Sequence, residues 1–272
     1  MKKLLCILLI LLLAGCAASE KTETVNLMQY ADPDTSGLFV TFYDGHNGCH
    51  KSMFEDEARR ELIAAFQNAE AELLPDFDPA TMTAPFYGVE MGGGDLGMVY
   101  GLWSDGVFLT KFGEAYAFDY DFEALLEHPD WQESGTYALT SFLQMPCAAY
   151  VVKGTDGWRS ELLPLSGVEE APEGIAMTLV EMEGKTITVL LSNQSGEEWY
   201  YGEYYHLEVQ LDGSWYQIPT DSTLEWGFHD IAMILPDGKT AEQTYNLEMY
   251  GTLPDGLYRL AAENLTVEFR VE

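Results

Sequence analysis

The second half of the chain carries the feature that most restricts its fold, a series of short strand-like runs separated by turn signals. From residue 176 to residue 271, β-branched and aromatic runs alternate with turn dipeptides such as Glu183-Gly184 and Asp212-Gly213, which are typical of hairpins. No helical period competes over this stretch. Seven or eight strands in about 100 residues are typical of an antiparallel β-sandwich. The Gly256-Leu257-Tyr258 sequence predicts a tyrosine corner, in which the phenol bonds to upstream backbone.

Several residues of this half give it a resemblance to a known family. The matching positions, in chain order, are Leu191, Asn193, Tyr201-Gly202, Tyr205, Leu207-Glu208, Asp212-Gly213, Trp215, Tyr250-Gly251, Leu253, Gly256 and Tyr258-Arg259. Together they resemble an immunoglobulin-like domain found at the C-terminal end of many bacterial surface lipoproteins. The resemblance implies a fold and a surface role, and it carries no catalytic residue. The cysteine pair of antibody domains is absent, so packing must hold the core.

The first half has a different pattern. A strand is expected over residues 38–43, and an apolar stripe that includes Leu62 and Phe66 predicts an amphipathic helix over residues 53–74, with Ser52 and Glu55 as a capping box. Strand-like runs then follow at meander spacing over residues 85–119, a short helix over 122–127, and a hairpin over 148–163. The expected fold is mainly β with two domains, an α+β domain over residues 38–168 (a helix on an antiparallel meander) and an immunoglobulin-like β-sandwich over residues 169–272.

The N-terminus predicts export and anchoring. Lys2 and Lys3 precede an apolar run over residues 4–13, which is too short to cross a membrane and is typical of a secretory signal peptide. The quartet Leu13-Ala14-Gly15-Cys16 resembles the lipobox of bacterial lipoproteins. That resemblance implies a signal peptide over residues 1–15, lipidation of Cys16, and a lipid-anchored tether over residues 16–37. The expected location is extracytoplasmic, with the lipid on Cys16 held in a bacterial membrane.

The charge of the chain excludes one class of partner. Its formal net charge is −32, and loss of the two lysines of the signal peptide would make it −34. Sequence-independent binding to nucleic acid depends on Lys and Arg side chains that neutralise phosphates, so no nucleic-acid partner is expected. The acidity is interpreted as a solvated coat that keeps an exported protein soluble.

Two cysteines remain besides Cys6 and Cys16. Cys49 and Cys147 form an even pair in an oxidising compartment, and a disulfide between them is one possibility, with two unbridged thiols as the alternative. His46, Cys49 and His50 are a weak candidate for a metal site, because one short cluster lacks the paired spacing of zinc motifs. A bridged or buried Cys49 with two surface histidines is the competing interpretation.

Five aromatic residues stand close together in the second half. They are Trp199, Tyr200, Tyr201, Tyr204 and Tyr205. They are candidates for a flat ligand platform that would grip a sugar, and the alternative is that they fill the core of the sandwich from a bulged strand.

The sequence contains none of the searched catalytic motifs. Gly-x-Ser-x-Gly, Ser-x-x-Lys, His-Glu-x-x-His, Cys-x-x-Cys and the phosphate-binding Gly-x-x-x-x-Gly-Lys are all absent, so no catalytic residue and no cofactor are assigned. The expected function is a non-enzymatic binding or interaction role at the cell envelope, with an envelope protein or a cell-wall glycan as the partner. The alternatives are a cell-wall polysaccharide-binding protein and an envelope hydrolase with its site in the first domain.

Overall fold

The structure is a computed structural model of the chain. It describes residues 24–25, 37–45, 48–53, 57–68, 71–92, 99–127, 132–133, 142–145, 147–154, 157–221 and 226–272. The predicted signal peptide and Cys16 lie outside these ranges. Within them, no helix has the length and apolar character needed to span a bilayer.

The N-terminal domain is built on one antiparallel sheet of nine strands in the order β1-β4-β8-β7-β6-β5-β2-β3-β9. Its strands are β1 (Thr24–Val25), β2 (Gly37–Tyr43), β3 (Gly48–Met53), β4 (Ala71–Leu73), β5 (Phe86–Gly92), β6 (Val99–Ser104), β7 (Val107–Thr110), β8 (Ala115–Ala117) and β9 (Gln132–Glu133). The helices of this domain are α2 (Glu57–Asn68), η2 (Pro79–Thr81), α3 (Phe122–Leu126), η3 (Phe142–Gln144), α4 (Ala148–Val152) and η4 (Ser160–Leu162). The predicted helix on an antiparallel meander is therefore confirmed.

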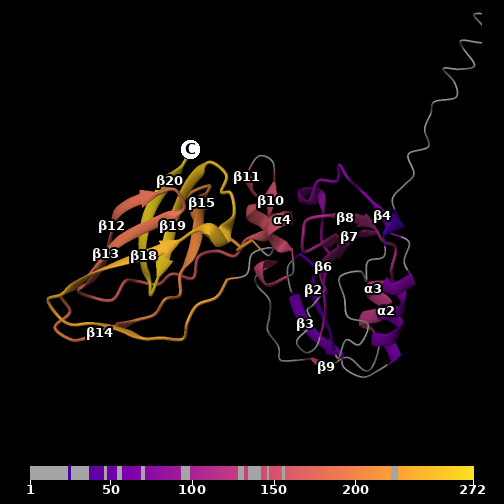
Figure 1. Ribbon diagram of the computed structural model, residues 1–272, viewed down its shortest axis with the longest axis horizontal. Helices are drawn as coiled ribbons and strands as arrows, with labels where there is room; N and C mark the ends of the chain where they lie inside the picture. Colours follow the sequence, from indigo (N-terminus) through magenta and orange to yellow (C-terminus); the bar gives the residue numbers. More distant parts are fainter. Residues whose placement is uncertain are drawn as a thin grey trace, which may run out of the picture.

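The two faces of this sheet carry separate apolar clusters. On one face, Val40 of β2 packs in a cluster with Phe66 of α2. On the opposite face, Phe86 of β5 belongs to a second cluster that contains Val151 of α4. This second cluster continues into the C-terminal domain, where it includes Tyr258. Figure 1 shows α4 and the hairpin of β10 (Lys153–Gly154) and β11 (Gly157–Trp158) between the two sheet systems.

The predicted helix over residues 53–74 is correct in its centre and wrong at its ends. Leu62 and Phe66 are fully buried, as the stripe predicts. Ser52, however, is not a helix cap, because it pairs with Phe39 in the β2–β3 ladder. At the other end, Ala71–Leu73 forms strand β4 beside β8. Pairing with neighbouring strands therefore overrides the local helical pattern on both sides of α2.

The predicted hairpin over residues 148–163 is also corrected. Ala148–Val152 is the helix α4, and only the short β10–β11 pair remains of the hairpin. A short apolar run does not distinguish a buried helix from a strand by its period. Burial of Ala148, Val151 and Val152 on one helical face decides in favour of the helix here.

The C-terminal domain has the predicted short antiparallel strands. They are β12 (Ile175–Glu183), β13 (Thr186–Asn193), β14 (Trp199–Tyr201), β15 (His206–Leu211), β16 (Ser214–Gln217), β17 (Met233–Leu235), β18 (Thr240–Asn246), β19 (Gly256–Ala262) and β20 (Leu265–Val271), with a short helix η5 (Glu248–Tyr250). They form a three-stranded sheet β12-β13-β18, a four-stranded sheet β16-β15-β19-β20, and the pair β14-β17. Asp212 and Gly213 have positive φ angles and close the β15–β16 hairpin as predicted.

The tyrosine corner is confirmed and also joins the two domains. The Tyr258 hydroxyl donates to the Pro254 carbonyl at 2.7 Å. The same oxygen accepts the indole N–H of Trp158 at 2.9 Å. Because Trp158 follows α4 in the chain, this bond fastens the first domain to the core of the sandwich.

Two segments outside the expected elements join sheets. Thr24–Val25, within the segment 16–37, pairs with β4 as strand β1. At the domain junction, Ser166 donates its N–H to Trp215 at 2.9 Å and Leu165 bridges Tyr216. The polar segment near the predicted boundary therefore runs along the edge of β16.

Candidate functional site

The five aromatic residues of the predicted platform do not form one flat surface. Tyr201 and Tyr205 are each 8% exposed, whereas Tyr200 is 57% and Tyr204 54% exposed. Trp199 stacks on Tyr201 with ring centroids 5.0 Å apart and packs against the core. Because side chains alternate along a strand, β14 sends Trp199 and Tyr201 inward and Tyr200 outward.

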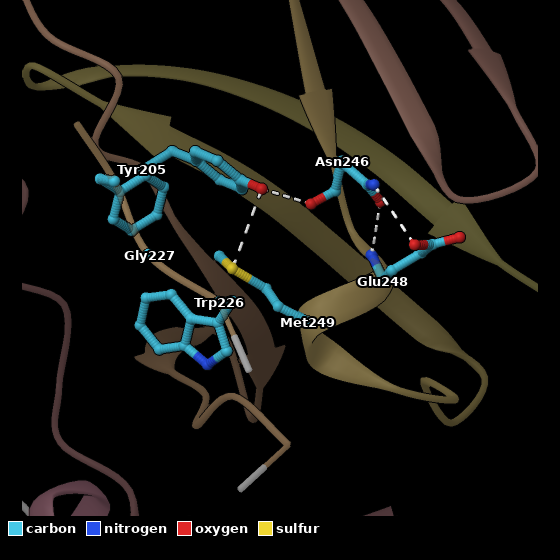
Figure 2. Close-up of a pocket in the computed structure, with 7 residues that line it drawn as sticks. Tyr205, Trp226, Gly227, Asn246, Glu248 and Met249 are labelled. Atoms are coloured by element: carbon cyan, nitrogen blue, oxygen red, sulfur yellow. Dashed lines mark hydrogen bonds between the residues drawn. The ribbon is translucent and has the colours of Figure 1, made fainter. Parts of the chain in front are cut away.

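A groove lies next to residues 199–205. Of the five aromatic residues there, only Tyr205 lines it. It has a volume of about 320 Å³, and it is lined by Tyr205, Trp226, Gly227, Phe228, Asn246, Glu248 and Met249. Figure 2 shows Tyr205, Trp226 and Met249 on one side of the drawn set, with Asn246 and Glu248 on the other. We call it the aromatic groove.

The apolar wall of the aromatic groove is a chain of ring contacts. Phe228 lies edge-on to Tyr205 at 5.2 Å and to Trp226 at 5.5 Å between ring centroids. Trp226 remains 47% exposed. A half-exposed indole held by a second ring leaves an aromatic face open to a ligand.

The buried end of the groove is fixed by hydrogen bonds. The Tyr205 hydroxyl donates to the Asn246 backbone carbonyl and lies 3.9 Å from the Met249 sulfur. Burial raises the pKa of Tyr205, although the bond to Asn246 opposes this effect. The phenol is therefore a neutral donor at physiological pH, and it holds the end of β18 against the ring wall.

The polar rim comes from Asn246, the last residue of β18, and from Glu248 in the turn that follows. The Asn246 side-chain oxygen accepts the Glu248 backbone N–H at 2.8 Å, and the Asn246 amide donates to the Glu248 carboxylate at 3.4 Å. An amide and a carboxylate are thus held beside an aromatic wall. Such a rim can accept and donate hydrogen bonds to a polar ligand.

A second polar cluster lies on β15 and β19 and has a structural role. Glu208 is fully buried, and its carboxylate accepts the guanidinium N–H of Arg259 at 2.6 Å and contacts His206 at 3.1 Å. Arg259 also donates to the Ser166 hydroxyl at 2.9 Å. Burial raises the pKa of Glu208, but the hydrogen bonds from His206, Ser166 and Arg259 outweigh it and hold the pKa below its usual value.

The weak metal candidate is not assembled among the described residues. His46 lies outside them, and Cys49 and His50 are consecutive on β3, which sends their side chains to opposite faces. His50 shares a hydrogen bond of 2.9 Å with the Thr41 hydroxyl. Within the described ranges, no three His, Cys, Asp or Glu side chains are grouped to hold a metal ion.

Of the two alternatives for Cys49 and Cys147, the structure has the unbridged one, with a free thiol at each position. Cys49 pairs with Phe42, which packs against the helix side of the sheet. Cys147 is fully buried in the cluster on the other side. The sheet therefore lies between the two side chains.

We expect the Cys147 thiol to resist alkylation in the folded protein. It is fully buried, and burial raises its pKa, so the reactive thiolate is scarce as well as inaccessible. Mass spectrometry after iodoacetamide treatment without reductant should find Cys147 unlabelled in buffer and labelled in urea. A Cys147 that stays blocked in urea until reductant is added would contradict the unbridged thiol.

The aromatic groove depends on residues that the sequence did not single out. Trp226 and Phe228 lie between the expected strands, and no spacing motif connects them with Tyr205 or Asn246. The only local signal is the pair of aromatic residues around Gly227 in a stretch without a strand pattern.

Comparison with known proteins places the groove in a domain of known class. Residues 173–271 match the family described as a bacterial Ig-like domain. The C-terminal domain is therefore a bacterial Ig-like domain, a class that suggests an extracellular or surface protein. No curated protein and no solved structure matches the chain.

Proposed function

We propose that the protein is a lipid-anchored cell-envelope protein that binds a cell-wall glycan, without chemical turnover, in the aromatic groove of its Ig-like domain. The observation that carries this proposal is the half-exposed Trp226 beside the rim of Asn246 and Glu248. Sugar rings present apolar C–H faces and hydroxyl edges. An indole face next to an amide and a carboxylate complements both surfaces.

The location follows from the N-terminal sequence and the domain class. The lipobox-like quartet ending at Cys16 would hold the mature chain at the outer face of a membrane. The bacterial Ig-like domain fits a surface protein, and the wall polymers are the extended glycans available there. The tether would allow the groove to reach those polymers.

The groove supports binding better than the alternative of an envelope hydrolase. Two carboxylates that act on one bond are the usual requirement for hydrolysis of a glycosidic link. Among the described residues that line the aromatic groove, Glu248 is the one that carries a carboxylate. That carboxylate accepts a hydrogen bond from Asn246, which suits a positioning contact with a sugar hydroxyl.

Replacement of Trp226 tests the proposal. In the mature chain with Cys16→Ser, Trp226→Ala should weaken retention on insoluble bacterial cell wall at least about tenfold, because the central aromatic contact is lost. The measurement is the fraction of protein that sediments with purified wall over a range of wall concentrations. Tyr200→Ala is the matched control, since Tyr200 is exposed in the same domain but does not line the groove.

The outcomes distinguish binding in the aromatic groove, at Trp226, from binding on the exposed surface at Tyr200. Retention that survives Trp226→Ala in a folded protein would contradict the proposal. Equal losses for Trp226→Ala and Tyr200→Ala would also contradict it, because they would assign binding to a broad exposed surface and not to the groove.

A further inference from the structure

A second cavity, of about 370 Å³, lies in the N-terminal domain, where the β6–β7 turn meets the start of α3. Its lining includes four aromatic residues, Tyr87, Trp103, Tyr120 and Phe122. Its volume falls in the range of small-molecule sites, about 300 to 1,000 Å³. The proposed glycan groove shares none of these residues, so the two sites are separate.

The four aromatic residues of the lining contact one another through Phe122. The rings of Trp103 and Tyr120 lie 4.9 and 5.0 Å from the Phe122 ring, with planes inclined by 40° and 66°. Tyr87 contacts the same ring at 5.3 Å. The Trp103 indole N–H donates to the Phe118 carbonyl at 2.7 Å, which fixes the orientation of this ring in the cavity lining.

The other notable lining groups are carboxylates. Asp105 lies in the β6–β7 turn, and Asp121 and Glu123 lie at the start of α3. None of the described residues that line the cavity is a lysine or an arginine. The cavity therefore joins aromatic faces to net negative charge, a combination that attracts cations by both charge and ring quadrupole.

Two tyrosines bring phenol groups to the lining of the cavity. Tyr87 is 5% exposed. Burial, and then the charges of Glu123 and Asp121, raise the pKa of Tyr87. Burial, Glu61 and Asp121 raise the pKa of Tyr120 to about 12. Both phenols thus stay neutral, and both lie in the negative electrostatic potential of the nearby carboxylates.

The arrangement suits an organic cation better than a metal ion. A hard metal ion needs several oxygens converging at about 2.0 to 2.6 Å. The described residues contain no such group of three side chains, and Asp121 already accepts the Ala124 N–H at 2.8 Å. A large, weakly hydrated cation needs aromatic faces and diffuse negative charge, which this cavity supplies.

We propose that this cavity binds a quaternary ammonium group, held against the Trp103 and Tyr120 faces and neutralised by Asp105 and Glu123. Such a group occurs on free small molecules and on lipid headgroups. The two sources share the chemistry that the cavity recognises.

Calorimetric titration with choline tests the proposal, on the mature chain with Cys16→Ser so that no lipid of its own carries the protein to vesicles. Choline should bind, and 3,3-dimethylbutan-1-ol, its uncharged analogue of the same shape, should bind at least about tenfold more weakly because it lacks the cation. The double variant Asp105→Asn/Glu123→Gln should weaken choline binding about tenfold. Asparagine tolerates the positive φ of 45° at position 105, so this change removes charge without straining the turn.

Glu127→Gln is the matched control, because Glu127 caps the same helix at its other end and does not line the cavity. Its choline affinity should stay within about twofold of the unchanged protein, because its charge lies outside the cavity and is screened by salt. Sedimentation with phosphatidylcholine vesicles would assign the ligand to a lipid headgroup, and choline binding without sedimentation would assign it to a soluble or polymer-bound molecule. Absence of choline binding, equal binding of the uncharged analogue, or equal effects of the double variant and Glu127→Gln would overturn the proposal.

Discussion

Replacing Arg259 with methionine should lower the free energy of unfolding by about 3–5 kcal/mol at neutral pH, the usual cost of leaving a buried charge without its partner. Glu208 is fully buried, and Arg259 donates to its carboxylate at 2.6 Å. The guanidinium also lies 4.5 Å from the centre of the Trp215 ring and bonds Ser166. One substitution therefore removes contacts to two strands and to the domain junction.

The loss should depend on pH in a defined direction. The folded-state pKa of Glu208 is depressed, so its contribution to stability is present above the unfolded value of about 4.3 and is lost as pH falls through the folded value. Without Arg259 the buried carboxyl protonates more readily. The difference between Arg259→Met and the unchanged protein should therefore be largest above about pH 5 and shrink below it.

Urea unfolding at several pH values measures both effects. Arg270→Met is the matched control, because Arg270 is exposed on the neighbouring strand β20, and its change should stay within about 0.5 kcal/mol. The double variant Glu208→Leu/Arg259→Met should be more stable than Arg259→Met alone, since no unpaired charge remains. Equal losses for the two arginine variants would rule out a role for the buried pair.

Gly101→Ala should destabilise the N-terminal domain by about 3 kcal/mol, at the upper end of the usual range for overpacking. A Cβ at this position would lie 1.9 Å from the tip of the Phe108 ring and 2.5 Å from its two neighbouring carbons. Phe108 is 1% exposed and lies edge-on to Phe66 of α2 at 5.2 Å. The ring therefore cannot move aside without displacing the helix.

Urea unfolding followed by circular dichroism measures this loss. Gly167→Ala is the control, because a Cβ there meets nothing within 4 Å. In the Gly101→Ala background, Phe108→Leu should cost less than it does alone, because the smaller side chain relieves the overlap. Additive losses in that double variant would show that the two positions do not share a contact.

The limits of sequence reasoning are clearest at α2 and α4. The apolar stripe locates Leu62 and Phe66 correctly, but it cannot show that Ser52 on one side and Ala71 on the other pair with distant strands. The run over Ala148–Val152 has strand-like composition, yet it forms a helix because it packs across a sheet face. In both cases long-range burial overrides local preference.

In the candidate site, too, the sequence predicts one part of the arrangement and tertiary packing decides the rest. Alternation along a strand predicts that some of its rings are internal, and Tyr201 and Tyr205 are. The groove itself depends on Trp226 and Asn246, which lie 21 and 41 residues after Tyr205. Only the packing of the turn after β18 against the segment before β17 brings them together.

The sequence by itself determined the turns, the antiparallel strands and the tyrosine corner of the bacterial Ig-like domain, because side-chain alternation and turn chemistry act over a few residues. Only the tertiary structure decided that Cys49 and Cys147 lie on opposite sides of a sheet and that Trp158 bonds Tyr258 across the domains. It also decided where the aromatic groove and the second cavity lie. These features join residues that are distant in the chain, and their convergence is set by how sheets and helices bury apolar surface.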